Sequence, residues 1–398
     1  MKHLLVINRY DDEFSDYSNY IDHTKIDVSY ITLTEKSKLI DPEISAYVIA
    51  VTDLSRELVL SAASNIHNKL PIDFVIAFSE YDLDVAALIR TKLNINGSKV
   101  TDNQLVRNKA NMKAALSGSS IRYPYYSEVS SREDILNFCQ KYDYPIILKP
   151  QVGAASDGVV KIEKIDDIPD LINFENYEVE EYIEGNIYHI DAILSDSKMP
   201  YFKVSKYINT CLDFRHGKPL GSVTIDDPKF ISMSKNFTKK VCELLKISNQ
   251  AIHLEAIEYK DELIFLEIGG RVGGGEIPFI TMRHEKVDLF ELWTKATIGE
   301  HIPVVSNQIT GFLMMPNPFA NDFSFNPSID ISHPLITWKN ISYSGHSEGF
   351  SYENIPARLH FCGPTQLEVE NAIKECMSIL SEAIQEVSQP KLELEKTY

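Results

Sequence analysis

Cysteine is scarce in this 398-residue sequence, and the few cysteines form no recognisable pattern. The five residues are scattered, are odd in number and include no C-x-x-C pair. Metal–thiolate sites and the disulfide frameworks of secreted domains require closely spaced or evenly paired cysteines. We therefore expect reduced thiols, and we expect Cys211 to fill space in the core rather than to react.

Long hydrophobic runs and a surplus of basic charge are also missing. No apolar stretch approaches the roughly 20 residues that a membrane-spanning helix needs, and the N-terminal apolar run is too short for a signal peptide. The 39 Lys and Arg residues face 57 Asp and Glu residues, which gives a formal net charge of −18. A grip on a nucleic-acid backbone requires clustered basic residues. We therefore predict a soluble, cytoplasmic protein that binds neither membranes nor nucleic acid.

The composition is that of a globular protein with more than one domain. Hydrophobic residues make up 44% of the chain and charged residues 24%, which excludes extensive disorder. The length favours two or three domains. In the first hundred residues, short apolar runs alternate with amphipathic stretches, which predicts a parallel sheet covered by helices. We place its strands at 3–7, 46–51 and 74–78 and its helices at 56–68 and 83–93.

Further helices and strands are predicted downstream, around a mixed central region. The predicted helices are 102–116, 131–141 and 366–387. The predicted strands are 146–148, 159–162, 177–182 and 311–315.

The most informative segment is a predicted hairpin with strands at 253–259 and 263–268. If the turn is centred on Asp261, Glu255 and Glu267 lie opposite each other on one face. The residues expected on the other, core-facing side are Leu254, Ala256, Ile264, Leu266 and Ile268. Opposed carboxylates repel, so we expect a cation between them, and paired oxygen ligands suit Mg²⁺. The alternative is a solvated sheet edge whose acids face water.

Two basic residues stand beside loops that contain glycine. Arg271 lies within the run 269–275, directly after the hairpin, and its planar fork suits phosphate or a developing oxyanion. Lys149 ends a predicted buried strand and precedes the small-residue loop 152–159, whose backbone N–H groups can bind anionic oxygens. The order G-x-x-x-x-G-K-[ST] is absent, so this is not a Walker A loop. A flexible loop and an ordinary hairpin turn are the plain alternatives.

Two further patterns are weak when each is taken alone. The segment 178–185 reads E-V-E-E-Y-I-E-G, a strand that ends in acids and glycine. The run 107–109 reads R-N-K at the front of a predicted helix. An acidic sheet edge and solvated basic side chains are the simpler interpretations.

In this order, the patterns resemble the ATP-grasp superfamily over roughly residues 70–300. The sequence is similar to the L-amino-acid ligases of that superfamily at four further places, namely I-N-R-Y-D-D at 7–12, F-S-E at 78–80, Y-H-I-D at 188–191 and E-I-G-G-R at 267–271. The resemblance implies an α/β, three-domain ATP-grasp fold. Its parts would be an N-terminal parallel-sheet domain (1–105), a small central lid domain (106–185) and a larger C-terminal α+β domain with an extension (186–398).

The resemblance also implies a nucleotide site. Lys109 and Lys149 would bind the ATP phosphates, and the loop 153–158 would close over them. The residues implied to contact ATP are Lys109, Lys149, Gly153, Ser156, Glu180, Glu181, Tyr182, Ile183 and Glu184. Residues 180–183 would form the adenine hinge. Glu184 would contact the ribose, because Ile187 stands where many relatives carry another glutamate.

The implied metal ligands are Glu255 and Glu267, which would hold Mg²⁺, with Mn²⁺ as the alternative. Many ATP-grasp enzymes have an asparagine two residues after the second acid, and Gly269 in its place leaves a leaner metal shell. Three residues near the motifs are substrate-binding candidates, namely Glu80, His253 and Glu276. A strand histidine such as His253 is more often a hydrogen-bonded structural residue.

The activity implied by the resemblance is ATP-dependent acid–amino-acid ligation. Two L-amino acids would be joined into a dipeptide through an acyl phosphate, with release of ADP and phosphate and with Arg271 stabilising the oxyanion. No side-chain nucleophile is needed, which agrees with the lack of a Ser-His-Asp or Cys-His arrangement. The alternatives are ligation of another carboxylate or a carrier-bound substrate, and a nucleotide-binding module without catalysis. The partners would be small-molecule amino acids and, by default, a second copy in a homodimer.

Overall fold

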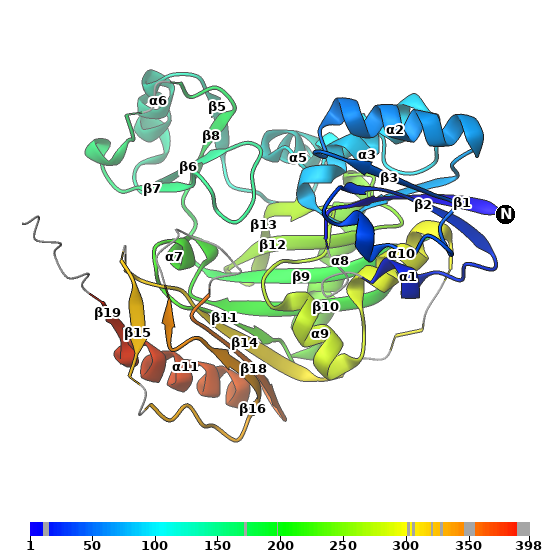
Figure 1. Cartoon of the computed structure of the whole chain (residues 1–398). Coiled ribbons are helices and arrows are strands. Elements are labelled where there is room, and N and C mark those ends of the chain that lie inside the picture. The colour runs from blue at the N-terminus through cyan, green and yellow to red at the C-terminus, as the bar shows by residue number, and fades with distance from the viewer. Residues whose placement is uncertain are drawn as a thin grey trace, which may run out of the picture.

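The computed structural model describes residues 1–387, except 11–15, 171–172, 197, 301–302, 305–306, 320, 327–328 and 346–354. Asp11 and Asp12 of the opening motif therefore lie outside the described residues. Figure 1 shows a parallel sheet near the N-terminus, a small lid and a large antiparallel sheet below them both. This mixed α/β architecture agrees with the predicted fold class.

The first sheet is parallel, as the alternating apolar runs predict. Its order is β3 (Tyr47–Val51), β2 (Ile26–Leu33), β1 (Lys2–Asn8) and β4 (Phe74–Ala77). Strand β2 was not predicted, although its first five residues alternate apolar and polar side chains as a half-buried strand does. The helices α2 (Arg56–Lys69) and α3 (Leu83–Lys92) lie where they were predicted.

Both faces of this sheet are buried against helices. Leu5 and Ile7 point to the face covered by α2 and α3. Leu4 and Val6 point to the opposite face. That face packs on α1 (Tyr17–Tyr20) and on α10 (Leu289–Ile298), a helix that comes much later in the chain. The first sheet is therefore joined to the large sheet through a shared apolar core.

The connection to the lid is two helices, where a single helix over 102–116 was predicted. Helix α4 (Val100–Gln104) ends early, and α5 (Lys109–Leu116) begins after a turn. Asn108 caps α5, because its side-chain oxygen accepts a hydrogen bond from the Asn111 N–H at 2.9 Å. Asparagine favours this extended N-cap conformation. The break places Arg107 in the turn rather than on a helix.

The lid is a small antiparallel sheet with one covering helix. Its strand order is β5 (Tyr126–Val129), β8 (Tyr177–Glu181), β6 (Ile146–Pro150) and β7 (Val160–Ile162). The helix α6 (Arg132–Tyr142) begins with a capping box between Ser131 and Asp134.

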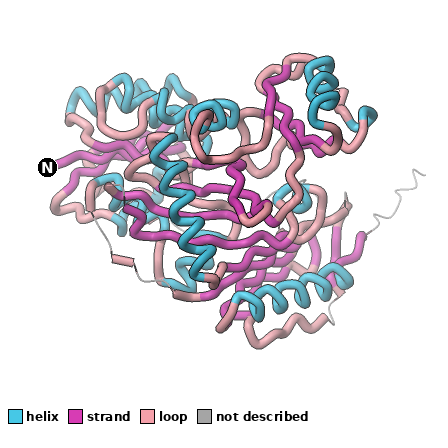
Figure 2. The backbone as a smooth tube through the Cα atoms, turned by 180° about the vertical axis from the view of Figure 1, so that it is seen from behind, coloured by secondary structure: helices cyan, strands magenta, loops and turns pink. Residues whose placement is uncertain are grey.

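The large sheet carries eight described strands, all antiparallel to their neighbours. Their order is β13 (Glu262–Gly269), β12 (Ala251–Tyr259), β9 (Asn186–Ser195), β10 (Lys198–Ile208), β11 (Leu220–Thr224), β14 (Ile309–Met315), β18 (Ala357–Gly363) and β16 (Ile336–Ile341). Helix α8 (Pro228–Leu244) crosses one face, as the view from behind in Figure 2 shows, and packs there with residues of β9 and β12. Helices α7 (Cys211–Arg215) and α9 (Ile277–Glu285) lie on the other face, toward the viewer in Figure 1.

The C-terminal helix is shorter than predicted. Helix α11 (Gln366–Ala383) ends before 387, and the chain continues as β19 (Ile384–Glu386). This strand pairs with β15 (Phe323–Phe325), which also pairs with β17 (Ser344–Gly345). None of the described helices is both long and apolar enough to cross a membrane.

The hairpin β12–β13 confirms the predicted pairing of Glu255 with Glu267. It reaches that pairing through a β-bulge. The turn is only Lys260-Asp261, both with positive φ, so Ile257 pairs with Ile264 and the register shifts before Glu255.

The bulge corrects the predicted core face. Leu254, Ala256 and Ile268 lie in the core with α8 as predicted. Ile264 and Leu266 do not, and instead pack with Ile183 on the opposite face. Because the turn has only two residues, Ile264 and Leu266 lie on the same face of the hairpin as Ile257. The extra residue in the bulge then places Glu267 on that face as well.

A buried ion-pair cluster fastens the lid to α5. Lys113 has a fully buried side chain that pairs with Glu178 and lies 2.9 Å from a carboxylate oxygen of Glu180, both on β8. The acidic strand is therefore not a solvated sheet edge.

We predict that Lys113→Ala lowers the free energy of unfolding by about 3–5 kcal/mol, because two buried carboxylates lose a partner. Urea unfolding followed by circular dichroism measures this change. Lys239→Ala is the control, since Lys239 has a 60% exposed side chain in an i,i+4 pair with Glu243 and should change stability by less than about 0.5 kcal/mol. Equal midpoints for the two variants would contradict the prediction.

Candidate functional site

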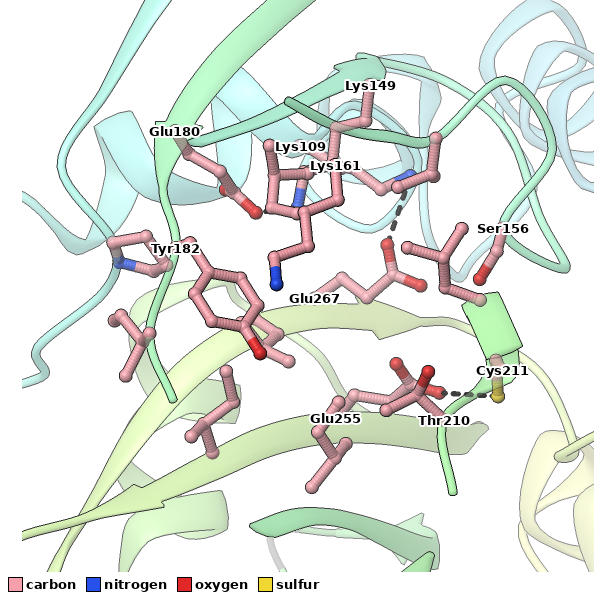
Figure 3. Close-up of a pocket in the computed structure, with 18 of the residues that line it drawn as sticks. Lys109, Lys149, Ser156, Lys161, Glu180, Tyr182, Thr210, Cys211, Glu255 and Glu267 are labelled. Carbon is pink, nitrogen blue, oxygen red and sulfur yellow. Dashed lines mark hydrogen bonds and ion pairs between the residues drawn. The ribbon is translucent and has the colours of Figure 1, made fainter. Parts of the chain in front are cut away.

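A pocket of about 280 Å³ lies between the lid and the large sheet. The lid strands β6 and β8 and the loop 153–159 form one wall, and β12, β13 and α7 form the other. Figure 3 shows Glu255 and Glu267 on neighbouring strands, facing the lid lysines and Ser156. The predicted site residues that line it are Lys109, Lys149, Gly153, Ser156, Glu180, Glu181, Tyr182, Ile183, Glu255 and Glu267.

Two lysines reach the pocket from different elements. Lys109 begins α5, and its ammonium lies 3.0 Å from a carboxylate oxygen of Glu267. Lys149 on β6 lies 2.5 Å from a carboxylate oxygen of Glu180. Burial alone lowers the pKa of Lys149, but the surrounding carboxylates outweigh it and raise the pKa above its usual range. Lys149 thus remains charged, as an anionic ligand requires.

The carboxylates of β8 form the buried side of the same network. Burial raises the pKa of Glu178 above its ordinary value, although Lys113 and Lys149 oppose this effect. For Glu180, the same two lysines outweigh burial and lower the pKa. The alternation of β8 therefore directs both acids toward lysines, while Val179 between them enters the lid core.

The loop between β6 and β7 has the backbone form of an anion-binding turn. Ala155 and Ser156 both have φ of 55°, and Gly158 has φ of 69°. Consecutive backbone N–H groups in such a turn can point at one anion. Asp157 pairs with Arg215 of α7, which connects the loop tip to the opposite wall.

The predicted hinge, 180–183, follows β8 into the connection to the large sheet. Its backbone is pinned by the Glu181 N–H, which donates to the Tyr125 carbonyl oxygen at 2.9 Å. Ile183 packs with Ile257 and Ile264, which gives the pocket an apolar end that suits a flat ring. Glu184 is exposed and is not part of the pocket lining, so its predicted ribose contact has no support from the pocket.

Glu255 and Glu267 differ in their surroundings. Burial raises the pKa of Glu267, but Lys109 and Lys149 outweigh this and lower the pKa to about 2. Glu255 has weaker contacts, with the Tyr207 hydroxyl at 3.3 Å, His253 Nε2 at 3.6 Å and the Cys211 sulfur at 4.0 Å. Two opposed oxygen donors, one of which pairs with no lysine or arginine among the described residues, fit a divalent cation such as Mg²⁺.

His253 is part of a hydrogen-bonded cluster beside the carboxylates. Its Nδ1 lies 2.8 Å from Asp191 Oδ1, and Nδ1 of His189 lies 2.7 Å from Asp191 Oδ2. Burial lowers the pKa of His253, whereas Asp191 and Glu255 raise it to about 9. The ligand atoms of the three residues lie within 4.8 Å of one another, but these hydrogen bonds already account for the arrangement.

The glycine loop after β13 lies directly against this cluster. A Cβ atom at Gly273 would lie 2.5 Å from Asp191 Oδ1 and 2.8 Å from His253 Nδ1. Gly274 has nothing within 4 Å of the same position. Position 273 therefore requires glycine because a larger residue would not fit. This close packing holds in place the loop that carries Arg271.

Arg271 lies outside the pocket lining and joins the large sheet to the first one. Its Nε donates to Glu80, and its Nη1 donates to the Val272 carbonyl oxygen at 2.8 Å. Arg107 pairs with the other carboxylate oxygen of Glu80. Burial lowers the pKa of Arg271, but Glu80 outweighs burial and raises it. Glu80 is thus placed between two guanidinium groups.

Glu276 lies apart from these contacts. Its carboxylate accepts a hydrogen bond from His360 Nε2 at 2.5 Å and lies 3.4 Å from Arg358 Nη1, both on β18. It is almost fully buried. Its predicted role in substrate binding stays a prediction.

Several pocket residues were not singled out from the sequence. Lys161 on β7 has its ammonium 4.2 Å from the centre of the Tyr182 ring. Thr210 and Asp213 form the capping box of α7, and Cys211, partly buried, follows Thr210. The capping pattern T-x-x-D was visible in the sequence and located the helix, but it does not reveal that the helix borders a pocket.

Comparison with known proteins agrees with this geometry. Residues 106–275 match the ATP-grasp domain family. An L-arginine-specific L-amino acid ligase from Bacillus subtilis is 24% identical over 335 residues, which cover 78% of this chain and 79% of the relative. Dapdiamide A synthase from Enterobacter agglomerans is 28% identical over 153 residues, or 34% of this chain and 35% of the relative.

Solved structures share the fold along nearly the whole chain. An L-amino acid ligase from Bacillus licheniformis has a TM-score of 0.73 at 15% identity, with 98% of this chain and 99% of that chain covered. A carboxyaminoimidazole ribonucleotide synthase from Aspergillus clavatus in complex with ATP has a TM-score of 0.68 at 14% identity, with 96% and 99% covered. The chain thus contains a segment, residues 106–275, that matches the ATP-grasp domain family, and over most of its length it is similar to an L-amino acid ligase.

Proposed function

We propose that the protein is an ATP-dependent carboxylate–amine ligase that joins two L-amino acids into a dipeptide through an acyl phosphate. The observation that carries the proposal is the pocket in which two lid-side lysines face two opposed glutamates, with Arg271 outside it on the side of the first sheet. The similarity to the L-arginine-specific ligase, which covers 78% of this chain, supports amino acids as substrates.

The pocket residues divide between the two ends of the nucleotide. The adenine would lie at the apolar end near Ile183, where the backbone of 180–183 can pair with its edge. The phosphates would lie near Lys109 and Lys149, under the loop 153–158. This assignment places the transferred phosphoryl group beside Glu267, because Lys109 already pairs with it.

Glu255 and Glu267 are the residues that would hold Mg²⁺. The bound ion neutralises charge on the phosphates when they are transferred. Glu267 is held ionised by its lysines, and Glu255 pairs with no lysine or arginine among the described residues, so both offer oxygen ligands. Cys211 is a poor candidate for a ligand, because burial raises the pKa of its thiol well above the usual value.

The reaction needs positioning and charge neutralisation rather than a protein nucleophile. A carboxylate oxygen of the first amino acid forms a bond to the γ-phosphorus of ATP, while the bond to the bridging oxygen breaks and ADP leaves. The amine of the second amino acid then attacks the acyl carbon. The amine loses a proton, the bond to the phosphate oxygen breaks and phosphate leaves. Arg271 would stabilise the oxyanion that forms in this second step.

Two predicted substrate-binding residues, Glu80 and His253, would act mainly by holding other residues in place. Glu80 would hold Arg271 in place and could accept a substrate ammonium beside its two arginines. His253 would keep the loop seated rather than contact substrate, because its Nδ1 is committed to Asp191.

We predict that Arg271→Ala reduces ligation by about 10²–10³-fold, since the oxyanion loses its donor. Phosphate release and the mass of the product measure ligation. Nucleotide affinity, measured by calorimetry, should stay near that of the unmodified protein, because Arg271 does not line the pocket. Arg271→Lys keeps the charge and should recover only part of the rate, because the lysine lacks the fork. Near-normal turnover of Arg271→Ala would refute the role.

We predict that Glu267→Gln and Glu255→Gln each raise the Mg²⁺ concentration needed for half-maximal phosphate release by about tenfold or more, because the site loses a charged oxygen ligand. A Mg²⁺ titration at saturating ATP measures this effect. Glu258→Gln is the matched control, since Glu258 lies on the same strand but accepts a hydrogen bond from Tyr188 at 2.8 Å. Unchanged Mg²⁺ dependence in both pocket variants would rule out the metal site.

We predict that Gly273→Ala lowers turnover by about 10²-fold while nucleotide affinity is kept, because the added methyl group displaces the Arg271 loop from Asp191 and His253. Gly274→Ala is the control one residue away, where the methyl group meets open space. Steady-state kinetics of the two variants give the comparison. The prediction is wrong if both variants behave alike.

One screen separates the proposal from its alternatives. Phosphate release from ATP is measured with single amino acids and with pairs, and products are weighed by mass spectrometry. Release only with pairs, together with a new dipeptide mass, supports the proposal. Release with one carboxylate and an unrelated amine indicates another ligase substrate. Nucleotide binding without release under any condition indicates a module without catalysis.

A further inference from the structure

A second cavity, of about 310 Å³, lies between the first sheet and helix α10. Its lining includes the beginnings of β1 and β4 and the loops 96–98 and 248–250. We refer to it as the interdomain crevice. None of the described residues lines both the crevice and the nucleotide pocket. The crevice is therefore a separate space, and the proposed ligase reaction makes no use of it.

One wall of the crevice is apolar and includes a tryptophan. The apolar lining residues are Phe74, Ile76, Leu83, Trp293, Ala296 and Ile298. Trp293 is almost fully buried from bulk solvent and lies against Phe78, with ring centres 5.3 Å apart. A cavity of this size with an aromatic wall is suited to a small organic molecule.

The other wall carries a cation that no acidic side chain of the described residues neutralises. The Arg90 guanidinium donates to the carbonyl oxygens of Ser98 at 2.9 Å and Val75 at 3.1 Å. These bonds use two of its five N–H groups. Burial lowers the pKa of Arg90 to about 10, with no carboxylate opposing the effect.

A second cation lies nearby and adds to the positive charge. Lys99 donates to the Arg90 carbonyl oxygen at 2.8 Å. Burial and the charge of Arg90 lower the pKa of Lys99, and Asp102 opposes them only in part. A partly buried cation without a counter-ion is unfavourable, and an anionic ligand would relieve that cost.

We propose that the interdomain crevice binds a small carboxylate with a compact apolar body, such as an aromatic or branched-chain acid. The carboxylate pairs with the free side of the Arg90 fork, and the apolar body lies against Trp293. A planar fork and a carboxylate make a charge-assisted pair of hydrogen bonds.

The position of the crevice links it to the arginines of the reaction site. Gly270 lines the crevice and directly precedes Arg271. An adjoining cavity of about 190 Å³ shares Gly97, Ser98, Ser248 and Gln250 with the crevice and reaches Val106, which directly precedes Arg107. A ligand in the crevice would therefore lie against Gly270, next to Arg271, while the adjoining cavity reaches the residue before Arg107.

Tryptophan fluorescence tests the proposal without any catalytic readout. The chain has two tryptophans. Trp293 is on α10, whereas Trp338 is on β16 of the large sheet. In the Trp338→Phe variant, emission comes from Trp293 alone. Sodium benzoate is titrated against this variant at saturating non-hydrolysable ATP analogue, and the neutral amide benzamide is titrated in parallel. We expect a saturable change with benzoate and at least about tenfold weaker binding of benzamide, which corresponds to 1.4 kcal/mol.

Two substitutions in the Trp338→Phe background locate the bound molecule. Arg90→Gln removes the charge and should abolish the benzoate response. Thr297→Leu fills the crevice from α10 and should abolish it while Arg90 is kept, which covers the case in which Arg90→Gln fails to fold. No response to benzoate, an equal response to benzamide, or a response that the ATP analogue removes would each overturn the proposal. Because only binding is measured, failure here is distinct from failure of the ligase proposal.

Discussion

Charge balance among the buried and partly buried side chains of the pocket wall is the constraint on which the rest of this structure depends. Three lysines pair with three glutamates in the lining of the pocket and directly behind it, namely Lys109, Lys113 and Lys149 with Glu178, Glu180 and Glu267. Buried charges are tolerated only in such pairs. Because these residues come from α5, the lid and the large sheet, pairing them fixes how the lid sits over the sheet. Glu255 stands outside the balance, so phosphates would enter with a cation that also takes up its charge.

A second ion-pair group connects the first sheet to the loop after β13. Glu80 follows the end of β4, and its two oxygens pair with Arg107 and Arg271. This arrangement positions the Arg271 guanidinium on the side of the first sheet, and the described lining of the pocket includes no arginine. The shared apolar core between the first sheet and α10 supports the contact. The first sheet thus contributes to the site through position and charge rather than through the nucleotide pocket itself.

The sequence was most informative where structure is local. Alternation predicted the pairing of Glu255 with Glu267, since a hairpin brings near neighbours together. It failed for Ile264 and Leu266, because the bulge depends on how a two-residue turn and the core compete for register. The pairing of Lys113 with Glu178 joins residues 65 positions apart. Such contacts depend on how separate elements pack together, and the hydrophobic periodicity of a sequence carries no information on that packing.

The loop that carries Arg271 is held at both ends, and this has a consequence for how it can respond to ligands. Gly273 has no room to move toward Asp191, and an added Cβ at Gly270 would lie 3.1 Å from a methyl carbon of Val106. Closely packed segments shift together rather than deform independently. Because Gly273 has no room to move, a displacement of Gly270 from the crevice side would act on Arg271 and Val272, which lie between these two glycines. Arg271 pairs with Glu80, so a shift of the backbone at Gly270 would change the geometry of this ion pair.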